Sequence, residues 1–153
     1  MEKIGSNILV IDDDLSVGKL ISHYLPRNKI LYYKSGEEAL TYLKNSNGIS
    51  HGFVDLMLPG QHFQGRELIE KIKQLNNKIK LFIITNHYTS YPPSTCIDCG
   101  ADGYIAKPLK GHIIQAIVAG ETEKIMNEML KVIPDNTLNL NSIKKPIPIE
   151  KIT

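Results

Sequence analysis

The sequence is poor in cysteine, and this excludes two common kinds of small domain. The two cysteines, Cys96 and Cys99, are too few for a disulfide framework, and two thiols alone cannot complete a tetrahedral zinc site. Their Cys-x-x-Cys spacing occurs in redox motifs, but the strand-then-helix context of a thioredoxin is missing nearby. We therefore favour an ordinary helix-turn segment here.

Long apolar runs and an excess of charge of one sign are also missing. No stretch approaches the roughly 20 apolar residues that span a bilayer, and residues 1–7 are polar rather than signal-like, so we expect a cytoplasmic protein without membrane contact. Eighteen Lys and Arg face sixteen Asp and Glu, and no segment carries a dense basic run. Nucleic-acid binding would therefore need a domain beyond this sequence.

What the sequence does contain is typical of one globular core. Its 153 residues are 42% hydrophobic and 22% charged, which is close to the average of globular proteins and unlike collagen, a coiled-coil rod or a disordered chain. Beyond Pro134 the composition shifts to Asn, Lys and Pro with isolated apolar residues. We expect one domain over residues 1–131 and a tail or linker over residues 132–153.

Short apolar runs alternate with segments of helical period, which is typical of a parallel sheet covered by helices on both faces. The expected strands cover residues 8–11, 30–33, a stretch ending at 53–55, 81–84 and 104–106. The expected helices cover residues 17–24, 35–43, a stretch ending at 75, a short piece at 93–99, and a last helix from after Pro108 to about Lys131. A polar loop is expected at residues 45–50.

Polar and charged side chains stand at the ends of these strands. Asp12 and Asp13 follow the first strand, Asp55 ends the third, Thr85 ends the fourth and Lys107 follows the fifth. Because the carboxyl ends of parallel strands meet at one edge of the sheet, these groups should lie together. Three converging carboxylates repel one another unless a lysine and a divalent cation compensate, so the pattern predicts a Mg²⁺ site. There Asp55 could attack phosphorus, with Thr85 bonding the transferred oxygens.

Four motifs in this order resemble the receiver domain of two-component response regulators, over residues 7 to about 130. They are Ile8-Leu9-Val10-Ile11-Asp12-Asp13-Asp14, Asp55-Leu56-Met57-Leu58-Pro59-Gly60, Ile83-Ile84-Thr85, and Gly100-Ala101-Asp102-Gly103-Tyr104-Ile105-Ala106-Lys107-Pro108. The resemblance implies a flavodoxin-like five-stranded sheet in the order 2-1-3-4-5 with five surrounding helices.

The resemblance also implies roles for individual residues. Asp55 is then the phosphoacceptor, Asp13 a direct Mg²⁺ ligand, Asp12 a ligand largely through water, and the Met57 backbone carbonyl the last protein ligand. In the same family pattern, Thr85 and Tyr104 form the switch pair, Lys107 pairs with a phosphoryl oxygen, and Pro108 often follows through a cis peptide bond.

As a receiver, the protein would take its phosphoryl group from a sensor histidine kinase or a phosphotransfer protein. It would not be an enzyme beyond its own phosphorylation and slow self-dephosphorylation. Met57 and His87 lie two positions beyond Asp55 and Thr85, near the path of an attacking water, so we expect the apolar Met57 to slow hydrolysis.

Three departures from the family pattern concern the surroundings of this site. The loop Gln61-His62-Phe63-Gln64-Gly65 is about two residues longer than the usual spacing to glycine. Asn86 stands where the family mostly has Ala, Gly or Ser, and Tyr91-Pro92-Pro93 shortens the fourth helix, which belongs to the family's usual output surface.

Two other functions fit parts of the pattern. Asp12-x-Asp14 after a buried strand resembles the nucleophile motif of haloacid-dehalogenase-type phosphatases, with Asp12 as nucleophile and Asp14 as acid or base. That class needs a later acidic pair for its metal, and no such pair follows Lys107. The other alternative is a receiver-shaped binding module that signals without phosphorylation, against which the complete Asp, Thr and Lys set argues.

The last predicted helix carries an apolar stripe longer than one sheet can cover: Ile125, Met126, Met129, Leu130 and Ile133. Soluble monomers seldom keep such a patch exposed. The tail is broken by Pro146 and Pro148 and is a poor cover, so we favour a homodimer through this helix over a tail that folds back.

Overall fold

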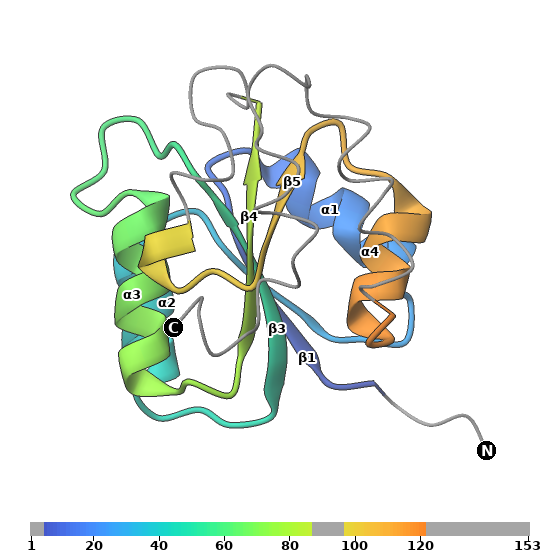
Figure 1. Ribbon diagram of the computed structural model, residues 1–153, viewed down its shortest axis with the longest axis horizontal. Helices are drawn as coiled ribbons and strands as arrows, with labels where there is room; N and C mark the ends of the chain where they lie inside the picture. Colours follow the sequence, from blue (N-terminus) through green and yellow to red (C-terminus); the bar gives the residue numbers. More distant parts are fainter. Residues whose placement is uncertain (1–4, 87–96, 122–153) are drawn as a thin grey trace.

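The computed structural model describes residues 5–86 and 97–121, and these residues form a five-stranded parallel sheet between two layers of helices (Figure 1). The strands are β1 (Asn7–Ile11), β2 (Ile30–Tyr33), β3 (Ile49–Asp55), β4 (Lys80–Thr85) and β5 (Gly103–Ala106). Every neighbouring pair is parallel and the order is β2-β1-β3-β4-β5, so the predicted 2-1-3-4-5 order is confirmed.

Four α-helices cover the two faces of the sheet. They are α1 (Leu15–Tyr24), α2 (Gly36–Leu43), α3 (Gly65–Leu75) and α4 (Gly111–Val118), and a short 3-10 helix, η2, covers Ile97–Cys99. Figure 1 shows α2 and α3 on one face and α1 and α4 on the other. Within the described residues, no helix is long and apolar enough to cross a membrane.

Successive strand residues point to opposite faces, and this builds two separate cores. Leu9 and Ile11 of β1 belong to the core beneath α2 and α3. Ile8 and Val10 belong to the core beneath α1 and α4. Both cores are closed by fully or nearly fully buried side chains, so the sheet is a rigid support for whatever stands at its edge.

Two of the described helices, α1 and α2, begin at a residue whose side chain caps the helix. The Asp14 side chain caps α1 by accepting the Ser16 backbone N–H at 2.9 Å, and Ser35 caps α2 by accepting the N–H of Glu38 at 3.4 Å. An ion pair of 2.6 Å between Lys73 of α3 and Asp102 ties α3 to the segment that leads into β5.

Two boundaries differ from those that the sequence predicted. β3 begins at Ile49, so the predicted polar loop at residues 45–50 is two residues too long. The pairing of β3 with β1 shifts register here: Asn7 pairs with Ile49 and Ile8 with His51, which leaves Ser50 as the extra residue of a bulge. Backbone pairing to β1 therefore extends β3 into residues whose side chains are polar, such as Ser50 and His51.

The last helix ends earlier than predicted. After Val118, Gly120 adopts a φ of 80°, its N–H donates to the Ile117 carbonyl, and the Glu121 N–H donates to the Ala116 carbonyl at 2.8 Å. This is a Schellman motif, which terminates a helix, so a single unbroken helix to about Lys131 is wrong at this point. Residues 122–153, with the predicted apolar stripe, the homodimer contact and the domain boundary, lie outside the described residues.

The predicted fourth helix is described only in its last part. Residues 97–99 form the 3-10 helix η2, with Cys99 buried in the core, and residues 93–96 lie outside the described residues together with Cys96. Of the five predicted helices, the described part of the chain contains four as α-helices.

Gly65 marks the closest approach between α3 and the end of β3. A Cβ atom at Gly65 would collide with the backbone carbonyl oxygen of Asp55 and lie 2.8 Å from the Cα of Leu56. Gly60, by contrast, has a left-handed φ of 75° but open space around its Cβ position. Only the first glycine is required by backbone packing.

We expect Gly65→Ala to lower the free energy of unfolding by ~3 kcal/mol, since the end of β3 must move to make room. The matched control Gly60→Ala should cost only ~1 kcal/mol, because it meets conformational strain without a collision. Urea unfolding followed by circular dichroism measures both values. An equal or smaller effect at Gly65 would contradict this account of the contact.

Candidate functional site

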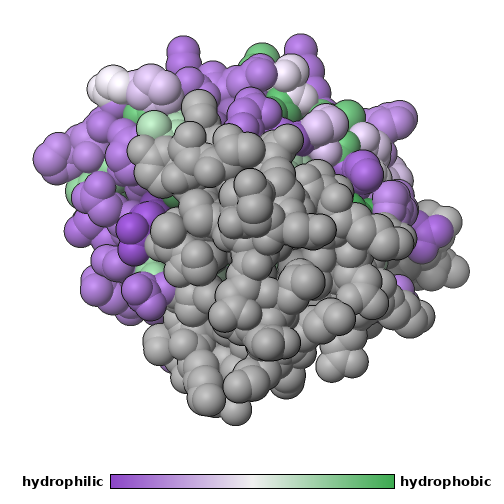
Figure 2. Space-filling view, turned by 45° about the horizontal axis from the view of Figure 1, so that its top comes forward, coloured by the Kyte–Doolittle hydropathy of each residue, from purple (hydrophilic) through white to green (hydrophobic). Residues whose placement is uncertain are grey.

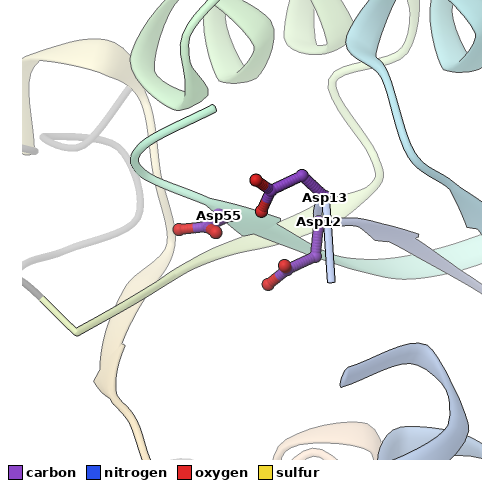
Figure 3. A group of neighbouring side chains, drawn as sticks. All are labelled: Asp12, Asp13 and Asp55. Carbon is purple, nitrogen blue, oxygen red and sulfur yellow. The ribbon is translucent and has the colours of Figure 1, made fainter. Parts of the chain in front are cut away.

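Three carboxylates meet where β1 and β3 end (Figure 3). Asp12 and Asp13 directly follow β1, and Asp55 is the last residue of β3, the strand beside it. One carboxylate oxygen from each lies within 4.8 Å of the others. Asp12 and Asp55 are buried, whereas Asp13 is exposed, so the cluster opens to solvent on the Asp13 side. The predicted convergence of these three residues is confirmed.

Asp12 is fixed by bonds to both its side chain and its backbone. Its Oδ1 accepts the backbone N–H of Asp14 at 2.9 Å, and its backbone carbonyl accepts the Tyr32 hydroxyl at 2.6 Å. Burial and the nearby Asp12 charge raise the pKa of Tyr32, which keeps this phenol a donor. Asp12 therefore presents its Oδ2 to the centre of the site.

Asp55 is under electrostatic stress. It is 6% exposed, and burial together with the neighbouring Asp12 charge raises its pKa from 3.8 to about 6, although Lys107 and the Met57 backbone N–H act in the opposite direction. Its Oδ1 accepts that N–H at 3.2 Å. The carboxylate is thus oriented by its own loop while part of its negative charge remains uncompensated.

Lys107 bridges the two buried carboxylates. Its Nζ lies 2.8 Å from Asp12 Oδ2 and 3.4 Å from Asp55 Oδ2. Burial lowers the pKa of Lys107, but the bond to Asp12 and the charges of both aspartates outweigh this and raise it above the usual value. The ammonium is therefore a permanent positive charge between the two strands.

The backbone N–H of Lys107 ties the end of β5 to the end of β4. Its N–H donates to the Thr85 carbonyl at 2.8 Å, which aligns the ends of β4 and β5, and the peptide bond to Pro108 is cis, as the family resemblance implies.

Thr85 and Tyr104 lie on neighbouring strands behind the cluster. Both are buried, at 0% and 7% exposure. In the sheet register Tyr104 pairs with Ile83 and Thr85 pairs with Ala106. Paired residues share a face of the sheet, and so do alternate residues of one strand. Thr85 therefore lies on the same face as Tyr104, and it is two residues nearer to the carboxyl end of the sheet than Ile83, the partner of Tyr104.

The other predicted residues take more peripheral positions. Met57 is partly buried and packs against the core beneath α2 and α3, and Asn86 and Pro108 are exposed. His87 lies outside the described residues. Asp14 accepts both the N–H and the hydroxyl of Ser16, so its carboxylate caps α1 instead of joining the cluster. Figure 2 shows this side of the molecule, where the described residues along the upper and left rim are mostly hydrophilic.

Sequence reasoning missed two glutamines that organise the loop between β3 and α3. The Gln64 side chain bonds the backbone N–H and carbonyl of Leu58, and the Gln61 side chain bonds the Lys34 carbonyl and the Gly36 N–H. The only hint in the sequence is the unusual length of this loop, because which backbone groups a glutamine reaches depends on the folded loop.

Comparisons with known proteins agree with this geometry. The family model for the response regulator receiver domain matches residues 8–119. Among curated proteins, the chain is 25% identical over 142 residues to a cyclic di-GMP phosphodiesterase of Thermotoga maritima, covering 92% of this chain and 36% of that protein. It is 28% identical over 109 residues to the regulatory protein VanR of Enterococcus faecium, covering 70% of this chain and 46% of VanR. The chain spans less than half the length of these relatives.

Solved structures give the same result. The BeF3-activated receiver domain of DrrB is 25% identical, with a TM-score of 0.66, and the match covers 78% of this chain and 98% of that one. A response regulator receiver domain protein from Clostridium thermocellum, at 24% identity and a TM-score of 0.67, shares the fold over 81% of this chain and 99% of its own.

The matched residues are the ones that build the parallel sheet and carry the acidic cluster at its edge. The chain belongs to the family of response regulator receiver domains.

Proposed function

We propose that Asp55 accepts a phosphoryl group from a sensor histidine kinase or a phosphotransfer protein, in a reaction that requires Mg²⁺. The observation that carries this proposal is the position of the Asp55 carboxylate, within 4.8 Å of Asp12 and Asp13 oxygens and 3.4 Å from the Lys107 ammonium. A nucleophile, acidic metal ligands and a cation for the transferred group thus stand together.

The residues present suit a hard divalent cation. Asp12, Asp13 and Asp55 offer carboxylate oxygens, and the family resemblance adds the Met57 backbone carbonyl. Oxygen atoms of both kinds are ligands that Mg²⁺ prefers. Lys107 is a single positive charge beside three carboxylates, and burial together with the Asp12 charge still raises the pKa of Asp55. When bound, the cation would supply the missing positive charge and draw a phosphoryl oxygen to the site.

The chemistry of the transfer follows from these positions. An Asp55 carboxylate oxygen attacks the phosphorus of a phosphohistidine, the phosphorus–nitrogen bond breaks, and the imidazole leaves with the electron pair, which yields an acyl phosphate on Asp55. Lys107 then pairs with a phosphoryl oxygen while it keeps its bond to Asp12. No other group of the chain needs to change its covalent state.

The signal would be relayed through Thr85 and Tyr104. The Thr85 hydroxyl turns toward the phosphoryl group, and the Tyr104 ring occupies the space behind it on the same face of the sheet. Support comes from the burial of both residues and their neighbouring places on β4 and β5.

The phosphodiesterase activity in the name of the Thermotoga relative is that of a longer protein, of which the match to this chain covers 36%.

Two alternatives remain as outcomes of the experiments. A phosphatase of the haloacid dehalogenase type would use Asp14 as its acid or base, but Asp14 is engaged in capping α1. A receiver-like module that signals without phosphorylation would keep the fold and show no labelling of Asp55.

We expect Asp55→Asn to abolish labelling by acetyl phosphate and Mg²⁺, because the amide is not a nucleophile. Intact-protein mass spectrometry should find one added phosphoryl group on the wild type and none on the variant. The control Asp14→Asn makes the same change two residues beyond Asp12 and keeps the helix cap, so it should be labelled like the wild type. Equal labelling of Asp55→Asn would refute the assignment, and an unlabelled wild type would favour the phosphorylation-independent module.

Without metal, the free energy of unfolding should depend on pH through the ionisation of Asp55. Because the folded-state pKa of Asp55 is raised from 3.8 to about 6, the native protein binds this proton more tightly than the unfolded chain does. The free energy of unfolding therefore falls as pH rises through this interval. In EDTA, wild type should lose ~2 kcal/mol relative to Asp55→Asn between pH 4 and pH 7. Urea titrations of both proteins measure this difference, and a difference that does not vary with pH would contradict the raised pKa of Asp55.

The lifetime of the acyl phosphate should depend on the side chain at position 57. Met57 is partly buried and apolar, and a water that attacks the phosphoryl group must pass close to it. A polar residue there would help to orient that water, so Met57→Glu should shorten the lifetime about tenfold, which is less than the roughly 10²- to 10⁴-fold effect of a well-placed general base. Loss of label after removal of acetyl phosphate gives the rate. The isosteric control Met57→Leu should retain the slow rate, and equal rates in all three proteins would remove this role.

A further inference from the structure

The peptide group between Met57 and Leu58 is held by the side chain of Gln64. Gln64 Oε1 accepts the Leu58 N–H at 2.7 Å, and Gln64 Nε2 donates to the Leu58 carbonyl at 2.8 Å. Nε2 also donates to the Gln61 carbonyl at 3.1 Å. One amide therefore satisfies both backbone groups of Leu58, in the loop that leads from β3 into α3 (Figure 1).

The orientation of this amide is determined by its partners. The Leu58 N–H can only donate, and the two carbonyls can only accept, so a flipped amide would lose all three bonds. Gln64 is also the residue that precedes α3, yet its side chain makes no capping bond to that helix. The side chain is directed at Leu58 instead of at its own helix.

Holding the Leu58 N–H also fixes the Met57 carbonyl. Both belong to one planar peptide group, and in a trans peptide the C=O points opposite to the N–H. Among the described residues the one cis bond is Lys107–Pro108, so the Met57–Leu58 bond is trans. A short hydrogen bond at the N–H also polarises the peptide and increases the negative charge on its oxygen.

We propose that Gln64 is a positioning residue for the metal site, which sets the direction and basicity of the Met57 carbonyl as a Mg²⁺ ligand. This inference rests on the proposed Mg²⁺ site, in which that carbonyl is a ligand. Partners that orient metal ligands change affinity by 10- to 100-fold when removed. In this loop, Gln64 takes the role of an orienting partner.

Gln61 provides a matched control in the same loop. Its side chain donates to the Lys34 carbonyl at 2.9 Å and accepts the Gly36 N–H at 3.3 Å, so it ties the loop to the start of α2. Neither bond touches the peptide group between Met57 and Leu58. Gln61→Leu therefore loosens the loop only. Gln64→Leu loosens the loop and also releases the peptide group that carries the Met57 carbonyl.

The test measures Mg²⁺ and Ca²⁺ affinity by isothermal titration calorimetry. Mg²⁺ demands near-ideal octahedral geometry and Ca²⁺ accepts irregular ligand sets, so a misdirected carbonyl should harm Mg²⁺ binding more. We expect Gln64→Leu to raise the Kd for Mg²⁺ at least about tenfold, and the Kd for Ca²⁺ less than about threefold. Gln61→Leu should leave the ratio of the two constants unchanged.

A second variant separates orientation from loop stability. Gln64→Glu keeps the acceptor for the Leu58 N–H and loses the donor to the Leu58 and Gln61 carbonyls. Its added charge affects both divalent cations alike, so the ratio of Mg²⁺ to Ca²⁺ affinity should stay near that of the wild type. Two results would overturn the proposal. One is a ratio of Mg²⁺ to Ca²⁺ affinity that Gln64→Leu leaves unchanged. The other is a ratio that falls as far in Gln64→Glu or Gln61→Leu as it does in Gln64→Leu.

A readout without metal covers the case in which Gln64→Leu does not fold. In the wild type, the Leu58 amide proton should appear downfield in a ¹H–¹⁵N spectrum and exchange slowly, and Gln64→Glu should keep both features. An unprotected Leu58 amide in the wild type would overturn the role of Gln64. If instead Mg²⁺ binds Asp55→Asn as tightly as the wild type, the proposed metal site itself fails.

Discussion

The burial of two neighbouring carboxylates, Asp12 and Asp55, at one edge of a parallel sheet is the constraint around which this domain is arranged. Parallel pairing brings the ends of β1 and β3 side by side, and this places Asp12 and Asp55 in one buried site. Lys107 reaches both from the end of β5. The native state tolerates the remaining negative charge because two apolar cores hold the strands in register regardless of it.

The edge strand β5 is fixed at both ends by ion pairs. Asp102, just before its first residue, pairs with Lys73 of α3, and Lys107, just after its last, pairs with Asp12 and Asp55. Tyr104 lies between these two anchors. A change of charge at the site therefore acts on β5 from its exit end, while its entry end stays attached to α3.

The fold and the members of the site could be read from the sequence because both follow from strand ends. Buried parallel strands appear as continuous apolar runs, and the polar residue after each run falls at the same edge. This logic placed Asp12, Asp55 and Lys107 correctly. It did not place the start of β3, because the bulge at Ser50 is polar yet paired through its neighbours.

Other features depend on contacts that no local pattern encodes. The end of α4 at Gly120 competes with an apolar stripe that continues in the sequence, and the left-handed turn of that one residue decides the outcome. The roles of Gln61 and Gln64 depend on which backbone groups the folded loop leaves within reach. A glutamine in a sequence gives no sign of the carbonyl that it will bind.

The loop between β3 and α3 is held in place beside the site by two glutamine side chains. Every loop residue other than proline brings one backbone donor and one acceptor that need partners when they are buried. Here the Gln64 amide supplies partners for the Leu58 N–H and for the Leu58 and Gln61 carbonyls. The Gln61 side chain fastens the loop to the Lys34 carbonyl and to Gly36, the first residue of α2. The connections β2–α2 and β3–α3 thereby form one mechanical unit, so exchanging this loop between receivers would require moving both connections together.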